Sequence, residues 1–161
     1  MKINTLLKIM AAVSINVGAV CLAPAAAAQD ALSFEGTAFV EKTVVEDGAE
    51  KTVQLPTDKV VPGDLIVFST AYRNGSADPV EDFVVTNPIP AAVALTDEAA
   101  AGLTVSVDGG QTFGSLSALK VAAEPDGDRP AMAADVTHIR WTLAAVAPGE
   151  GGTLSYKAFV R

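Results

Sequence analysis

Cysteine and histidine are almost absent from this sequence of 161 residues, which contains one of each, Cys21 and His138. Zinc sites are built from clustered Cys and His ligands, so the sequence offers no such site. A Ser–His–Asp arrangement would have to use His138, and no serine lies in a Gly-x-Ser-x-Gly turn. Glycine loops of the Walker and dinucleotide-binding types are also missing. The sequence therefore predicts a protein that is not an enzyme, with no catalytic residue and no cofactor.

Only one long apolar run occurs, over residues 9–22, and it stands at the beginning of the chain. Lys2 and Lys8 precede it, Pro24 breaks it, and the small residues of the stretch 25–28 follow. A positive segment, an apolar segment and a small-residue exit, in that order, are typical of a secretory signal peptide. We expect a signal peptide over residues 1–28, with cleavage after Ala28.

Two other interpretations of this segment remain open. A retained membrane anchor would need about 20 apolar residues, more than the run contains, and it would leave the alanine-rich exit unexplained. A lipoprotein signal would make Cys21 the lipidated first residue. That cleavage requires a small residue before the cysteine, whereas Val20 stands there. We therefore expect an exported chain with no stable transmembrane segment after processing, located in the periplasm, at the cell surface or outside the cell.

Positive charge is scarce in the part that remains after cleavage. The full chain has a formal net charge of −8, and removal of residues 1–28 takes away Lys2 and Lys8 but no acid, which changes the charge to −10. An acidic domain repels phosphate backbones and anionic lipids, so we expect no nucleic-acid partner. The 133 remaining residues contain no cysteine and suffice for one domain that depends on its apolar core.

Helix signals are also scarce, and apolar residues instead recur at every second position, as is typical of β-strands. In the segment 137–143, for example, Ile139, Trp141 and Leu143 alternate with His138 and Arg140. Strands are predicted over residues 34–45, 51–55, 64–73, 80–86, 103–107, 137–143 and 153–160, with a weaker one over 113–121. Residues 91–102 are predicted to be a loop with one helical turn, and 122–134 a polar loop.

Short strands separated by Gly/Pro turns favour a sandwich or a barrel. The long connections after Pro90 and Val121 favour a sandwich with Greek-key crossings. We predict an all-β, immunoglobulin-like antiparallel sandwich of seven to nine strands. An N-terminal hairpin within residues 29–56 would pack as one domain with residues 57–161.

The order of several short blocks resembles the DUF11 family, cell-surface repeat domains of bacteria and archaea with an immunoglobulin-like fold. The blocks are Val61-Pro62-Gly63-Asp64-Leu65-Ile66-Val67-Phe68, Tyr72-Arg73-Asn74-Gly75, Val84-Val85-Thr86-Asn87-Pro88-Ile89-Pro90, Ile139-Arg140-Trp141-Thr142-Leu143 and Val146-Ala147-Pro148-Gly149-Glu150. The resemblance covers about residues 60–160 and implies a scaffold that spaces, packs or adheres at the envelope. Family members typically carry tandem copies, whereas this sequence carries a single copy and an additional N-terminal hairpin.

The residues of these blocks also have a physical interpretation of their own. Pro62-Gly63-Asp64 is expected to form a tight entry turn, and Asn74-Gly75 to allow positive φ at a strand exit. Trp141 is expected to fill the core between two sheets.

Two sets of residues are candidates for binding. Asp108, Asp126 and Asp128 lie in glycine-rich turns and offer the hard oxygen ligands that calcium prefers, although acidic turns of an acidic domain are ordinarily just solvated. Phe39 and Phe159 are predicted to face outward on the terminal strands, where they would form a contact surface unless a neighbouring strand covers them.

The leading hypothesis is a non-catalytic structural or protein-interaction module of adhesion type in the cell envelope or surface. Its partners would be envelope or surface proteins or further copies of itself. The first alternative is a subunit of an extracellular fibre or coat assembled by strand addition, with residues 31–45 as the exchanged strand. The second alternative is a small-ligand carrier or an enzyme.

Overall fold

A computed structural model describes residues 31–123, 125 and 127–161 of the chain. The predicted signal peptide, Cys21 and Asp126 lie outside the described residues. The elements, in chain order, are β1 (Leu32–Glu46), β2 (Ala49–Leu55), β3 (Leu65–Asn74), β4 (Val80–Pro88), β5 (Val93–Leu95), α2 (Asp97–Gly102), β6 (Thr104–Ser106), the 3-10 helix η1 (Leu116–Ala118), β7 (Lys120–Ala123), β8 (Gly127–Pro130), the 3-10 helix η2 (Ala133–Asp135), β9 (His138–Val146) and β10 (Gly151–Val160).

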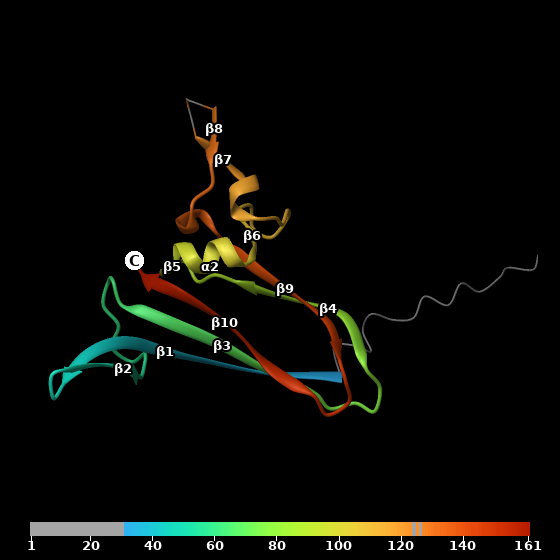
Figure 1. Ribbon diagram of the computed structural model, residues 1–161. Coiled ribbons are helices and arrows are strands. Elements are labelled where there is room, and N and C mark those ends of the chain that lie inside the picture. The colour runs from blue at the N-terminus through green and yellow to red at the C-terminus, as the bar shows by residue number, and fades with distance from the viewer. Residues whose placement is uncertain (1–30, 124, 126) are drawn as a thin grey trace, which may run out of the picture.

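The strands form antiparallel sheets, which confirms the all-β prediction. A five-stranded sheet has the order β2-β1-β3-β10-β5, and a three-stranded sheet has the order β4-β9-β6. In Figure 1 the five-stranded sheet is the lower layer, β4 and β9 run above it, and the separate β7–β8 ribbon projects upward. The chain passes between these two sheets at β3–β4, β4–β5, β5–β6 and β9–β10, so that strands distant in sequence become neighbours.

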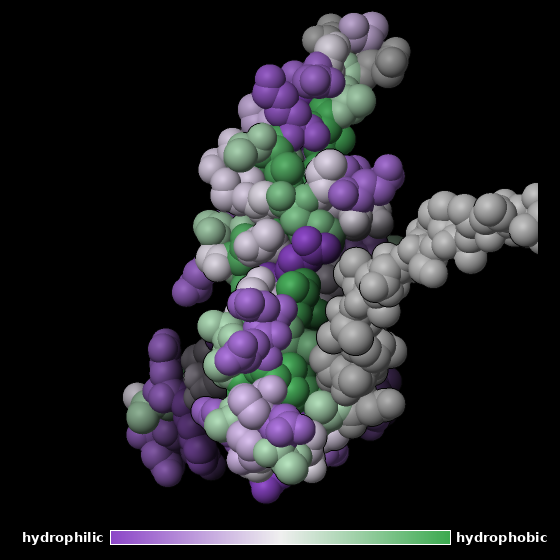
Figure 2. Space-filling view, turned by 90° about the vertical axis from the view of Figure 1, so that its right-hand side faces the viewer, coloured by the Kyte–Doolittle hydropathy of each residue, from purple (hydrophilic) through white to green (hydrophobic). Residues whose placement is uncertain are grey.

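Both sheets contribute to the apolar interior. The larger cluster joins Ile66, Tyr156 and Ala158 of the five-stranded sheet to Val105 and Ile139 of the three-stranded sheet. Trp141 packs against this cluster, with its ring 6.3 Å from that of Tyr156 in the opposite sheet, as expected of a core residue. A smaller cluster joins Leu32 of β1 to Val80 of β4 and Val146 of β9. Figure 2 shows hydrophobic residues in an interrupted column up the middle of one face, with hydrophilic residues on both sides.

The N-terminal hairpin closes through a two-residue turn. Asp47 and Gly48 have φ of 53° and 80°, the left-handed conformation that this kind of hairpin connection requires. β1 then pairs with β2 over seven positions and with β3 over ten. Residues of the predicted hairpin therefore belong to the main sheet.

Three local predictions differ from the structure. The segment 113–121 is not a strand, since it contains an isolated bridge at Gly114, then η1 and the start of β7. The segment 122–134 is not simply a loop, because it contains β8 and η2. These additions and the short β5 bring the described strands to ten, more than the seven to nine predicted.

The third difference is at Asn74-Gly75. Gly75 does not have positive φ, and the Asn74 side chain is completely buried. Its Nδ2 donates to the carbonyl oxygens of Asp78 and Val146, and its Oδ1 accepts from the backbone N–H and the hydroxyl of Ser76. Hydrogen bonds of the side chain, and not backbone freedom, therefore fix the exit from β3.

Candidate functional site

Phe39 and Phe159 lie on the same face of the five-stranded sheet, the face directed away from the three-stranded sheet. Phe39 is opposite Val67 of β3, and Phe159 is opposite Leu65 of the same strand. Residues 65 and 67 share one face of a strand, so the two phenylalanines flank β3 diagonally. We call Phe39, Leu65, Val67 and Phe159 the outer patch.

An ion pair crosses the outer patch along the other diagonal. Glu41 is opposite Leu65, and Lys157 is opposite Val67. The Lys157 Nζ lies 2.7 Å from Glu41 Oε1, so these two side chains meet above β3. The arrangement follows from period two, which places Glu41 beside Phe39 and Lys157 beside Phe159 on the same face.

Exposure differs strongly within the outer patch. Val67 is only 8% exposed although it lies on the outer face. Phe159 keeps 45% of its surface exposed, whereas Phe39 is half-buried. In Figure 1 no described helix or strand lies beneath this face of the sheet. The outer patch is therefore an apolar and aromatic surface that is open to solvent mainly at Phe159 and is crossed by one ion pair.

Of the predicted calcium ligands, the structure describes Asp108 and Asp128, which lie on different elements. Asp108 follows β6 and Asp128 lies exposed on β8, while Asp126 is outside the described residues. Among the residues that the structure describes, no three His, Cys, Asp or Glu side chains form a group suited to a metal ion.

The Asp108 carboxylate instead organises its own turn. It accepts hydrogen bonds from the Ser106 hydroxyl, the backbone N–H of Gln111, and both the backbone N–H and the hydroxyl of Thr112. The bond from the Thr112 hydroxyl, followed by that from the Thr112 N–H, holds the pKa of Asp108 well below its usual range. These bonds give the carboxylate a structural role in the turn.

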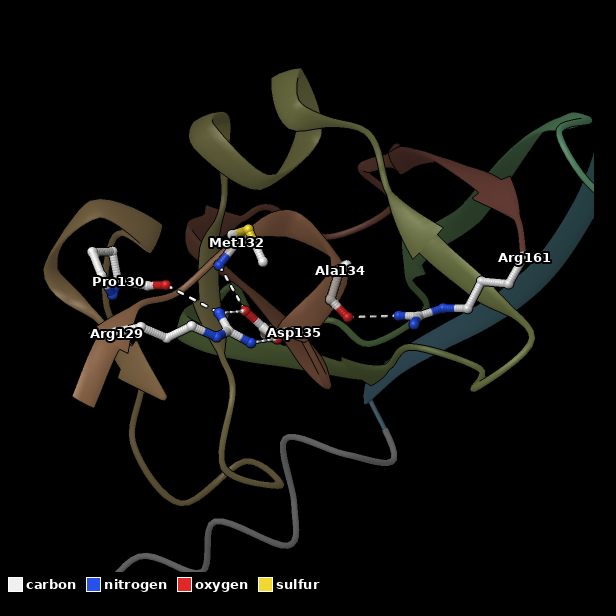
Figure 3. Close-up of polar contacts among 6 residues, drawn as sticks. All are labelled: Arg129, Pro130, Met132, Ala134, Asp135 and Arg161. Carbon is white, nitrogen blue, oxygen red and sulfur yellow. Dashed lines mark hydrogen bonds and ion pairs between the residues drawn. The ribbon is translucent and has the colours of Figure 1, made fainter. Parts of the chain in front are cut away.

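A second charged group fastens η2 to its surroundings (Figure 3). Arg129 donates from its two terminal guanidinium nitrogens, Nη1 and Nη2, to the two carboxylate oxygens of Asp135, at 2.6 and 2.7 Å, and this ion pair lowers the pKa of Asp135. Asp135 also accepts from the backbone N–H of Met132, and Arg161 donates to the carbonyl oxygen of Ala134. These bonds position η2, from which Ala133 enters the core.

His138 lies on the outer face of β9, as its place in the alternating pattern predicted. It is half-buried, packs beside Gly110, and has its Nδ1 3.2 Å from the Thr137 hydroxyl. The neighbouring Arg140 stacks its guanidinium 3.5 Å from the ring centre of Phe113. These contacts pin the loop after β6 to β9, which is a packing role.

Two of the open hollows among the described residues exceed 300 Å³. One, of about 390 Å³, lies beside α2 and is lined by Thr96, Glu98, Leu103 and Tyr156 among others. The other, of about 340 Å³, lies beside the hairpin at Val40, Leu55 and Lys59. Both are wide open to solvent, unlike the enclosed apolar sites that bind most small ligands.

Sequence reasoning found Phe39 and Phe159 but missed Leu65, Val67 and the Glu41–Lys157 pair. The alternating pattern contained half of the necessary signal, because it places each charge next to a phenylalanine on the same face. The alternating pattern did not show that β1 and β10 both pair with β3. This pairing brings Phe39 and Glu41 of β1 close to Lys157 and Phe159 of β10.

Comparisons with known proteins found no relative. No family model matches the sequence, no curated protein matches it, and no solved structure matches the fold. None of the described helices has the length and apolar character needed to span a membrane.

Proposed function

We propose that this chain is an exported, non-catalytic β-sandwich module of the cell envelope or surface, which binds a protein partner through the outer patch. The observation that carries the proposal is the pair Phe39 and Phe159, which flank an ion pair on a sheet face that no described helix or strand covers. Aromatic side chains contribute most of the binding energy at many protein interfaces. A charged pair among them adds orientation, because a partner must present matching charges.

The sandwich itself is part of the proposal. Two antiparallel sheets share one interior, and the chain crosses between them at β3–β4, β4–β5, β5–β6 and β9–β10. These crossings support Greek-key connections and an immunoglobulin-like arrangement. Such a scaffold holds the backbone of its outer face rigid, so binding at the outer patch would have to order side chains but not the backbone.

The predicted signal peptide favours a binding partner outside the cytoplasm. The positive, apolar and small-residue segments of residues 1–28 favour secretion, and the net charge of −10 that remains opposes binding to anionic lipid. A protein of the periplasm, the outer envelope or the surface is therefore the partner class we expect. The resemblance to cell-surface repeat domains agrees with it.

Site-specific photo-crosslinking in cells tests this proposal. A photoreactive phenylalanine analogue replaces Phe159 in one chain and Thr153 in another, an exposed residue on the same face of β10. We expect a discrete adduct of defined mass with an envelope protein from position 159 and none from position 153. The proposal is wrong if both positions give the same adducts, or if position 159 gives none.

Charge exchange provides the matched specificity control. The double substitution Glu41→Lys with Lys157→Glu keeps the ion pair but reverses its direction, so the fold should be preserved. We expect the adduct at position 159 to weaken at least about tenfold, since like charges would then oppose each other across the interface. An unchanged adduct would mean that the ion pair has no part in recognition.

A further inference from the structure

The hairpin leaves one regular strand edge unpaired. β2 is the last strand of the five-stranded sheet, and in the described part of the chain it pairs with β1 alone. The turn at Asp47-Gly48 closes the pair Glu46 and Ala49, whose backbone groups bond to each other. Because bonded and non-bonded pairs alternate, Lys51, Val53 and Leu55 also direct their backbone groups to β1. Glu50, Thr52 and Gln54 therefore direct their N–H and C=O groups away from the molecule.

We propose that two copies of this chain pair antiparallel along β2, with Thr52 of one copy opposite Thr52 of the other. This register places Glu50 opposite Gln54 of the second copy and forms six N–H···O=C bonds, all from the outward-directed groups. Lys51 faces Val53 of the second copy, so no like charges are directly opposed. The occupant of this edge is thus a second copy of the same strand.

Neighbouring registers are less favourable. Sliding the second copy by two residues in one direction places the two Lys51 side chains opposite each other. Sliding it by two residues in the other direction leaves two of the six bonds unmade. In the proposed register, the Lys51 ammonium remains 3.0 Å from Glu46 of its own hairpin, which neutralises it near the two-fold axis. Charge and hydrogen bonding therefore select the same register.

The β4 edge is protected against such pairing. Pro79 precedes β4, Pro88 ends it, and Asp82 interrupts it with a φ of 48°. Prolines and backbone kinks on an edge strand prevent the addition of another strand. β2 has neither device within Ala49–Leu55. Leu55 is also 42% exposed on the face that continues the core, so pairing would bury apolar surface.

The pairing has a functional consequence that rests on the proposed function. A two-fold axis at Thr52 stands perpendicular to the sheet, so the two five-stranded sheets become continuous and their outer faces point to the same side. Two outer patches would then meet one surface together. Such bivalent binding raises the apparent affinity without any new contact.

Cysteine crosslinking of the purified chain tests the pairing without any partner protein. In a Cys21→Ser background, Thr52→Cys places two thiols on residues whose Cα atoms lie about 5.5 Å apart in a bonded antiparallel pair, within disulfide range. Thr43→Cys is the control, because Thr43 is the β1 neighbour of Thr52. The two copies of residue 43 would lie about 14 Å apart, three strand spacings.

We expect Thr52→Cys to form disulfide dimers in air at least about ten times faster than Thr43→Cys. Light scattering should give twice the monomer mass for the unmodified chain at high concentration. Thr52→Lys, which opposes two ammonium groups, should restore the monomer mass, whereas Thr43→Lys should not. Circular dichroism of each variant verifies its fold.

Three outcomes would overturn the proposal. These are a monomer mass at every concentration, equal disulfide rates at positions 52 and 43, or a ladder of higher masses as an open strand exchange through β1 would give. None of them bears on the adduct at position 159, so failure of the pairing is distinguishable from failure of the proposed function.

Discussion

Asn74 Nδ2 donates a hydrogen bond to the carbonyl oxygen of Val146 at 2.9 Å, across 72 residues of sequence. The bond connects the end of β3 in one sheet to the end of β9 in the other. The Asn74 backbone adds two more bonds, from its N–H to the carbonyl oxygen of Glu150 and from the Gly149 N–H to its own carbonyl oxygen. One buried side chain therefore fastens both chain crossings at this end of the molecule.

Replacing Asn74 with alanine should destabilise the protein by about 1–3 kcal/mol, since the buried carbonyl oxygen of Val146 loses its partner. Groups of Ser76 and Asp78, which lie nearer the surface, lose one as well. Urea unfolding followed by Trp141 fluorescence measures the change in the free energy of unfolding. Asn87→Ala is the control, because the side chain of Asn87 makes no hydrogen bond within the described residues, and it should cost about 0.5 kcal/mol or less. Equal midpoints for the two variants would refute this role of Asn74.

The long half-buried strands were predictable from the sequence because each has one solvent-exposed face and one buried face, so that polar and apolar residues alternate. In β10, Tyr156 and Ala158 are buried while Ser155 and Lys157 are exposed, as the alternation predicts. The short ribbon β7–β8 was missed, since strands of four residues contain too few periods for alternation to be recognised.

Long-range polar contacts could not be predicted in the same way. Glu41 and Lys157 are 116 residues apart, and only the pairing of β1 and β10 with β3 brings them together. Asn74 in Asn-Gly has the sequence of an ordinary turn, and its burial depends on a carbonyl group far along the chain. Propensity and periodicity contain no information on such partners. The sequence therefore predicted Phe39 and Phe159 of the candidate site but not the Glu41–Lys157 ion pair.

Gly151 tests how tightly β10 approaches β3. A Cβ built on Gly151 would collide with the backbone oxygen of Tyr72, which cannot move aside as a flexible side chain would. We expect Gly151→Ala to destabilise the protein by about 1–3 kcal/mol, the usual cost of overpacking. Gly36→Ala is the matched control, because a Cβ at Gly36 in β1 meets nothing within 4 Å.

Thermal or urea unfolding of the two glycine variants gives the comparison. The Gly36 variant should equal or slightly exceed the unmodified protein in stability, because alanine reduces the entropy of the unfolded chain. If both variants were equally stable, the backbone of β10 at Gly151 would lie farther from Tyr72 of β3 than it does in the structure.

Acid should weaken the protein through Asp108. Hydrogen bonds from Thr112 and Ser106 lower the pKa of Asp108 below its ordinary value of 3.8. A carboxylate whose pKa is lower in the folded state stabilises that state above about pH 4, and this contribution is lost as the pH falls through the folded value. The urea midpoint should therefore fall between about pH 4 and pH 2.

Asp108→Asn should lower the urea midpoint at neutral pH and flatten its decline in acid, because the charge that these bonds stabilise is gone. The decline will not vanish, since Asp64 and Asp135 also have lowered pKa values. Asp128→Asn, at an exposed position on β8, should retain the shape of the original curve. If the urea midpoint of Asp108→Asn fell in acid as steeply as that of the unmodified protein, the Asp108 carboxylate would not be the cause of the decline.

Alkali should weaken the protein through Tyr156, whose burial raises its pKa from 10 to about 12. A raised pKa means that the folded state holds the proton more firmly than the unfolded chain. This stabilisation is complete below about pH 10 and is lost as the pH rises through about 12. Stopped-flow pH jumps that record phenolate absorbance before unfolding should show one of the two tyrosines ionising near pH 12. Tyr156→Phe should remove that step, whereas the absence of any step near pH 12 in the unmodified protein would mean that Tyr156 lies in contact with water.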